Sequence, residues 1–142
     1  MKLTGQFSSP ADVAKLLALD GQLDQLERVP SLDDVRRDSS GRIRAIFTPR
    51  ATFVPMPFAV VIAVEHAGQS DAALKVHASR GPTAVDVQLK LEFDQRDSGT
   101  SVSWHAEVAV RGPGASVGQR VVRDLVSAAI DEVLRETAAV AA

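Results

Sequence analysis

The stretches that decide the fold are VDVQLKLEF at residues 85–93 and VSWHAEVAV at residues 102–110. In both, apolar residues alternate with polar ones, the period of a β-strand that has one face in a core and the other in water. The turn-forming residues Asp97-Ser98-Gly99 separate the two stretches, which therefore predict an antiparallel pair. One face of the resulting sheet is apolar, so another element must cover it and exclude water.

The same period and the same turn chemistry predict further strands on the amino-terminal side of this pair. Including the pair itself, the predicted strands cover residues 2–7, 31–37, 42–48, 57–67, 71–79, 84–94 and 100–111. Because each connection after the second strand is short, we expect a seven-stranded antiparallel sheet.

Helical signals lie at both ends of the chain. The sequence Ser9-Pro10-Ala11-Asp12 predicts a helix start, with Ser9 as cap. Apolar residues then recur at helical spacing as far as Val29, interrupted at Asp20-Gly21, which predicts two short helices that meet at a bend. From Ser116 to about Ala139 the apolar and charged residues lie on opposite sides, as in a long amphipathic helix.

Only the carboxy-terminal helix is long enough to cover the apolar face of the sheet. The predicted fold class is therefore α+β, with a curved sheet wrapped around one long helix, the helix-grip arrangement. Since the two short helices close only one end, we expect a cavity between the sheet and the long helix. This arrangement favours ligand binding over any particular chemistry.

Composition excludes several classes of function. The 142 residues are 45% hydrophobic and 24% charged with a net charge of −2, which predicts one globular domain over residues 1–142. The chain has no cysteine, so disulfides, a thiolate nucleophile and thiolate metal sites are excluded. Lysine and arginine are dispersed, so we expect no nucleic-acid partner. No apolar stretch is long enough for a transmembrane segment, and we expect a cytoplasmic protein.

Three segments resemble a known family. The opening MKLTGQF (residues 1–7), GTSVSWHAEVAVRG (residues 99–112) and VGQRVV (residues 117–122) are similar to the CoxG subunit of carbon monoxide dehydrogenase, within the START-like SRPBCC superfamily that also includes polyketide cyclases. The sequence RVPS at residues 28–31 departs from the family's Cys-Ile-Pro-Gly-like turn. No further tail follows Ala142, so we expect no membrane anchor of its own.

The resemblance implies a helix-grip fold and a function in binding or assistance. It implies a cytoplasmic accessory protein of molybdenum hydroxylase systems, such as CO dehydrogenase, which reaches a membrane through its partner. It equally implies a protein that binds apolar molecules, among them quinones and other lipids.

An apolar connection, FTPRATFVPMPF at residues 47–58, holds three of the five phenylalanines and three of the seven prolines. Such a segment is either part of the core or the rim of a pocket, since Phe and Met adapt to irregular apolar ligands. Strand and helix residues of matching parity complete the expected wall. The expected cavity residues are Phe47, Phe53, Met56, Phe58, Val60, Ile62, His66, Trp104, Val122, Val126 and Ala129. If Trp104 points into the cavity, a bound carbonyl or a water would accept its indole proton.

Residues that could carry catalysis or hold a metal are few. His66 shares the parity of Ile62, which places it at the cavity mouth, whereas His77 and His105 fall on the solvent face with a strand between them. No metal ligand set, cofactor or catalytic residue is predicted. The glycines of GPGASVG at residues 112–118 precede a helix but lack the lysine of a phosphate-binding loop, and indicate only a turn.

The leading hypothesis is non-catalytic binding of a hydrophobic small molecule, lipid or quinone-like, in service of a redox enzyme complex. The alternatives are a polyketide cyclase or aromatase that uses His66 and Arg44, and a protein-interaction module. The latter would use Asp33-Asp34 and Arg36-Arg37, which otherwise indicate a solvated edge strand. The identity of the ligand and of the partner, and the oligomeric state, stay open.

Overall fold

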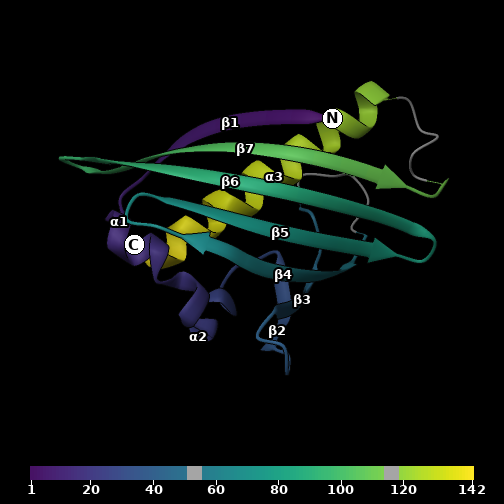
Figure 1. The fold of residues 1–142 in the computed structure, drawn as a ribbon, viewed down its shortest axis with the longest axis horizontal. Coiled ribbons are helices and arrows are strands. Elements are labelled where there is room, and N and C mark those ends of the chain that lie inside the picture. Colours follow the sequence, from purple (N-terminus) through teal and green to yellow (C-terminus); the bar gives the residue numbers. More distant parts are fainter. Residues whose placement is uncertain (51–55, 114–118) are drawn as a thin grey trace.

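Seven strands form one sheet in the computed structural model, which describes residues 1–50, 56–113 and 119–142. The strands are β1 (Lys2–Ser9), β2 (Leu32–Arg37), β3 (Ile43–Phe47), β4 (Phe58–Ala67), β5 (Asp71–Arg80), β6 (Thr83–Arg96) and β7 (Gly99–Arg111). Their order across the sheet is β1-β7-β6-β5-β4-β3-β2, and every neighbouring pair is antiparallel (Figure 1). The predicted antiparallel sheet is confirmed.

The longest strands, β6 and β7, come from the two alternating stretches that decide the fold. They pair in register from Ala84 opposite Arg111 to Arg96 opposite Gly99. Gly99 has φ 138°, in the region that favours glycine, and a Cβ there would overlap the backbone carbonyl oxygen of Ser9. The turn between the two strands therefore depends on this glycine.

Short helices follow β1, as predicted, with two differences in detail. The elements are α1 (Val13–Leu17), the 3₁₀ turn η1 (Leu19–Gly21) and α2 (Leu23–Leu26). The capping residue is Asp12, whose side chain accepts from the Lys15 N–H at 2.9 Å, and not Ser9. Ser9 ends β1, and its hydroxyl accepts instead from the Ala11 N–H at 3.2 Å. The predicted bend is the 3₁₀ turn itself.

The carboxy-terminal helix α3 (Gln119–Ala141) crosses one face of the sheet, which confirms the helix-grip arrangement (Figure 1). It extends two residues beyond the predicted end, while the predicted start at Ser116 lies outside the described residues. Its backbone comes closest to β1, α1 and α2. Among the described residues no helix is both long and apolar enough to cross a membrane.

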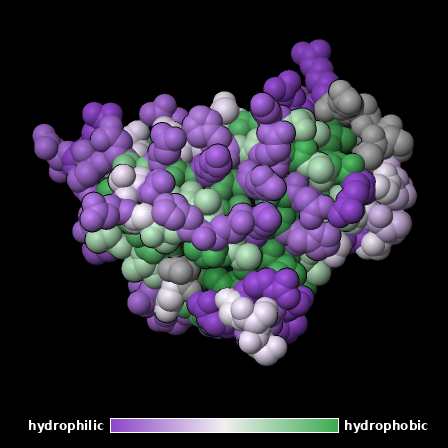
Figure 2. Space-filling model, in the orientation of Figure 1, coloured by the Kyte–Doolittle hydropathy of each residue, from purple (hydrophilic) through white to green (hydrophobic). Residues whose placement is uncertain are grey.

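The other face of the sheet is in water. Hydrophilic residues cover much of the side of the molecule that Figure 2 shows, and hydrophobic residues are visible between them. His105 and Glu107 of β7, and Lys90 and Glu92 of β6, are exposed, whereas the residues between them on each strand are buried. The predicted alternation between a core face and a solvent face is therefore observed.

Candidate functional site

The inward side chains in the middle of the sheet are less buried than they would be in a filled core. The strand β5 is the fourth of seven in the sheet, so neighbours cover both of its edges. Its inward residues Ala72, Leu74, Val76 and Ala78 are nevertheless only half-buried. Since side chains in protein cores are close-packed, half-burial at the centre of a sheet means that open space lies above it.

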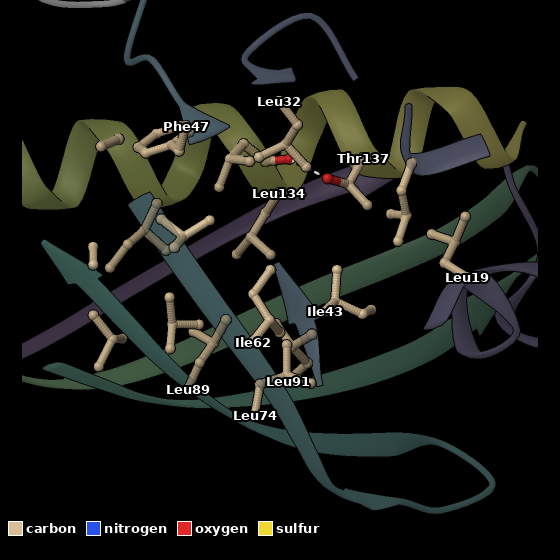
Figure 3. A pocket seen from close by; sticks show the side chains of 18 of the residues that line it. Leu19, Leu32, Ile43, Phe47, Ile62, Leu74, Leu89, Leu91, Leu134 and Thr137 are labelled. Carbon is tan, nitrogen blue, oxygen red and sulfur yellow. Dashed lines mark hydrogen bonds between the residues drawn. The ribbon is translucent and has the colours of Figure 1, made fainter. Parts of the chain in front are cut away.

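This space is a cavity of about 370 Å³ between the sheet and α3. Side chains from the strands and from the helix point toward one another across it (Figure 3). Its walls are aliphatic and aromatic, and Thr137 is the one hydroxyl-bearing residue among the described lining residues. The Thr137 hydroxyl donates to the Val133 carbonyl oxygen of its own helix at 2.6 Å. The cavity thus offers a ligand almost entirely apolar contact, and the proton of its one described hydroxyl is already donated to the helix backbone.

On one flank of the cavity, polar side chains attach α3 to the first and last strands. The Trp104 indole N–H donates to Asp131 Oδ1 at 3.3 Å, and Arg135 Nε donates to Asp131 Oδ2 at 2.6 Å. The Arg135 guanidinium also lies over the Phe7 ring, 5.2 Å from its centroid. Here Trp104, which is only 1% exposed, fills the space between sheet and helix.

On the opposite flank, two glutamates of α3 bind the chain on either side of β2 and β3. The Ser31 hydroxyl donates to Glu136 Oε1 at 2.5 Å. The Arg50 backbone N–H donates to Glu132, and its guanidinium lies 3.7 Å from Glu136 Oε2. The helix is therefore held at both flanks and spans the cavity between them.

Most of the predicted cavity residues do line the cavity. They are Phe47, Met56, Phe58, Val60, Ile62, Val126 and Ala129. Phe53 lies outside the described residues. Alternate residues of β4 point toward the cavity, namely Phe58, Val60 and Ile62. Val126 and Ala129 lie on the apolar side of α3. These placements follow from the strand and helix periods.

His66 is not among the residues that line the cavity, because β4 contains a bulge. The pairing between β4 and β5 shifts between Val64 and His66, so that Val64 faces Leu74 and His66 faces Ala73. One extra residue reverses the parity beyond that point. Ala67 therefore faces the cavity, while His66 is exposed with its Nε2 3.4 Å from Asp71 Oδ1.

Trp104 and Val122 also lie apart from the cavity lining. The indole of Trp104 packs over Gly5 of β1, where a Cβ would overlap the ring. Its N–H donates to Asp131, an acceptor that could not be identified from the sequence. Val122 belongs to the first turns of α3, which lie beside β1, as the bond from Arg123 to the Lys2 carbonyl oxygen shows. The lining contributed by α3 begins at Leu125.

The other candidate for catalysis, Arg44, binds Asp38 outside the cavity, at the turn between β2 and β3. Arg44 Nε donates to Asp38 Oδ2 at 3.0 Å. The hydroxyl and N–H of Ser40, the N–H of Arg42 and Arg44 together hold the pKa of Asp38 far below its ordinary value. Neither residue of the cyclase hypothesis, His66 or Arg44, lies in the cavity lining.

His77 lies on the solvent face, as predicted. Its Nδ1 is 2.7 Å from Asp86 Oδ1, and Arg111 binds the other carboxylate oxygen. The hydrogen bond from His77, followed by the charge of Arg111, lowers the pKa of Asp86. Within the described ranges no three His, Asp or Glu side chains gather as a metal site would require.

Sequence reasoning missed the larger part of the wall, including inward residues of β5 and β6 such as Leu74 and Leu89. It also missed the part that comes from the short helices, η1, β2 and β3. These lining residues are Leu16, Leu17, Leu19, Leu26, Leu32, Val35 and Ile43. The signal was present in the helical spacing of the leucines between residues 16 and 26, but it predicts only an apolar helix face and not the surface that this face covers.

The fold defines a structural class, the START-like helix-grip fold. Solved structures with the same fold include a conserved protein from Geobacillus kaustophilus, with a TM-score of 0.79 at 14% identity over 97% of this chain and 93% of that one. A START superfamily protein from Mycobacterium smegmatis has a TM-score of 0.67 at 10% identity, covering 95% and 92% of the two chains. A Thermus thermophilus protein reaches 0.65 at 12% identity, covering 97% and 94%.

Within this class the chain belongs to the CoxG family, that of the CoxG subunit of carbon monoxide dehydrogenase, whose sequence pattern matches residues 5–142. The resemblance seen in the sequence is thereby confirmed. No curated protein matches this chain.

Proposed function

We propose that this protein binds a hydrophobic small molecule, lipid or quinone-like, in the cavity between the sheet and α3, without catalysing a reaction. The observation that carries the proposal is the half-buried centre of the sheet above a cavity of about 370 Å³. Ligand pockets in proteins are typically about 300–1,000 Å³ and mainly apolar.

The energy of such binding comes from buried area. At about 25 cal/mol per Å², a ligand that buries about 300 Å² of apolar surface gains on the order of 7 kcal/mol before ordering costs. Micromolar affinity corresponds to a binding free energy of about 8 kcal/mol. A ligand that reaches this affinity must therefore bury more apolar surface against the cavity walls. No polar group of the ligand has to enter the cavity.

The family adds a context. The CoxG family takes its name from a subunit of carbon monoxide dehydrogenase. We propose that this chain is a cytoplasmic accessory protein of an enzyme of the CO dehydrogenase or molybdenum hydroxylase type, and that its bound molecule serves that enzyme.

The proposal is tested by native mass spectrometry of the freshly purified chain, followed by organic extraction. We expect a bound mass that organic solvent removes, and uptake of the fluorescent probe N-phenylnaphthylamine by the stripped protein. The variant Ala129→Phe, which places a ring in the cavity, serves as the control and should take up neither. A parent protein that carries no apolar molecule and takes up no probe overturns the proposal.

A further inference from the structure

We infer that Met56 is an oxidation site, and that the cavity loses affinity for apolar molecules when hydrogen peroxide converts the Met56 thioether to a sulfoxide. This inference rests on the proposed function and adds its regulation. Met56 is 38% exposed, and it is also one of the residues that line the cavity. The same side chain is therefore open to a dissolved oxidant and in contact with the space in which a ligand would lie.

The chain offers peroxide few other targets. It contains no cysteine, and its two methionines are Met1 and Met56. The single tryptophan, Trp104, is only 1% exposed. Met1 is as exposed as Met56, at 39%, but it does not belong to the described lining of the cavity. The two thioethers therefore differ in whether they border the cavity, and Met1 serves as an internal control.

The reaction transfers one oxygen atom to the side chain. The Sδ atom of Met56 attacks one oxygen of hydrogen peroxide, so that an S–O bond forms and the O–O bond breaks. The sulfur is oxidised by two electrons, and the departing hydroxide takes the proton of the transferred oxygen and leaves as water. The product is a polar sulfoxide, which methionine sulfoxide reductases convert back to the thioether with electrons from thiols.

The cavity wall has no hydrogen-bond donor for the new oxygen among its described side chains. The one hydroxyl in this lining, that of Thr137, already donates to the Val133 carbonyl oxygen at 2.6 Å. Burial of a polar group without a hydrogen bond costs free energy. The oxidised side chain of Met56 must therefore turn toward water, and a ligand in the cavity loses its apolar contact.

The backbone at Met56 has little freedom to compensate. Met56 precedes Pro57, and a residue before proline is restricted to extended conformations. The next residue, Phe58, begins β4 and lines the cavity itself. The chain at this point is therefore not free to bring another apolar side chain into the place that the sulfoxide leaves.

The test is graded oxidation of the stripped full chain with hydrogen peroxide, followed by titration with N-phenylnaphthylamine. Peptide mass spectrometry measures the sulfoxide fraction at Met1 and at Met56 separately. We expect probe affinity to fall in proportion to the Met56 fraction, by about tenfold at full oxidation, which corresponds to about 1.4 kcal/mol. Treatment with the two methionine sulfoxide reductases, one for each epimer, and dithiothreitol should restore the affinity.

Met56→Leu is the matched variant, because leucine is apolar and has no sulfur. Its probe affinity is compared before and after the same peroxide treatment. We expect no change between the two measurements, although Met1 is still oxidised in this variant.

Three results would overturn the inference and leave the binding function intact. They are resistance of Met56 to peroxide while Met1 is oxidised, unchanged probe affinity at full Met56 oxidation, and a peroxide-dependent loss of affinity in Met56→Leu as large as in the parent. If Met56→Leu does not fold, the first two results in the parent chain still decide. A parent chain that takes up no probe before oxidation overturns both this inference and the proposed function.

Discussion

The two halves of the interface between sheet and helix follow the same sequence pattern and pack in opposite ways. In the packed half, Trp104, Ala106 and Val108 of β7 and Leu3 of β1 are all at most 5% exposed. In the open half, the inward residues of β5 have the same alternation but are only half-buried above the cavity. Alternation therefore decides which face a side chain takes, but not whether anything fills the space in front of it.

The difference comes from side-chain volume and from anchoring. In the packed half one indole lies over a glycine, Gly5, and its N–H is satisfied by Asp131 of the helix. In the open half two of the four inward residues of β5 are alanines, Ala72 and Ala78. The helix does not come closer to these alanines, because its attachments at both flanks fix its distance from the sheet. The packed half stabilises the fold, and the open half is free to hold a ligand.

The largest effect is expected from emptying the packed half. Trp104→Ala removes a fully buried ring and its bond to Asp131, and should lower the free energy of unfolding by about 3–5 kcal/mol. Leu74→Ala in the open half should cost clearly less, since the Leu74 side chain already borders empty space. Denaturant titration of both variants measures the contrast, and equal losses would mean that the two halves are equally filled.

The same substitution should act in opposite ways in the two halves. Ala106→Phe overpacks the filled half and should cost about 1–3 kcal/mol, whereas Ala129→Phe enters the cavity and should leave the melting temperature unchanged or raised. Ala129→Phe should also abolish uptake of N-phenylnaphthylamine, which Ala106→Phe, where folded, retains. Melting curves and probe titrations check both. A clear drop in melting temperature for Ala129→Phe would show that the walls already touch.

A smaller effect is expected at the turn between β2 and β3, outside the cavity lining. The side chain of Asp38 accepts from Ser40, Arg42 and Arg44, which lowers its pKa. A carboxyl whose folded-state pKa is lowered stabilises the fold above its ordinary value of 3.8, and that contribution is lost as the pH falls below it toward the folded-state value. Asp38→Asn should therefore melt slightly below the parent at neutral pH, and the gap should narrow below pH 3.8. A gap that does not change with pH would contradict this.

The smallest effect is expected at His66. Because the bulge turns this side chain away from the cavity, His66→Gln should leave probe affinity within about twofold and stability within about 0.5 kcal/mol. Probe titration and thermal melting measure both quantities. A positioned general acid or base typically contributes about a hundredfold or more to a rate. A comparable loss of function in His66→Gln, with folding and affinity intact, would favour the cyclase hypothesis.

The sequence alone was sufficient for the elements and for a minor part of the cavity wall. Strand and helix periods are local properties, so alternation at residues 85–93 and the apolar stripe of α3 predicted the sheet, its cover and the inward direction of Phe58, Val60, Ile62 and Ala129. The family resemblance rested on residues 1–7, 99–112 and 117–122, and is confirmed by the match over residues 5–142.

Tertiary structure decided what periodicity does not contain. His66 was misplaced because a one-residue bulge reverses parity without changing the composition of the strand. The acceptor for Trp104 is Asp131, which is 27 positions away in the chain and reaches the indole only because α3 folds back beside β1. The cavity is the volume that side chains leave unfilled between the sheet and a helix held at both flanks. That volume depends on all the side chains that face it and on the curvature of the sheet, and not on any local pattern.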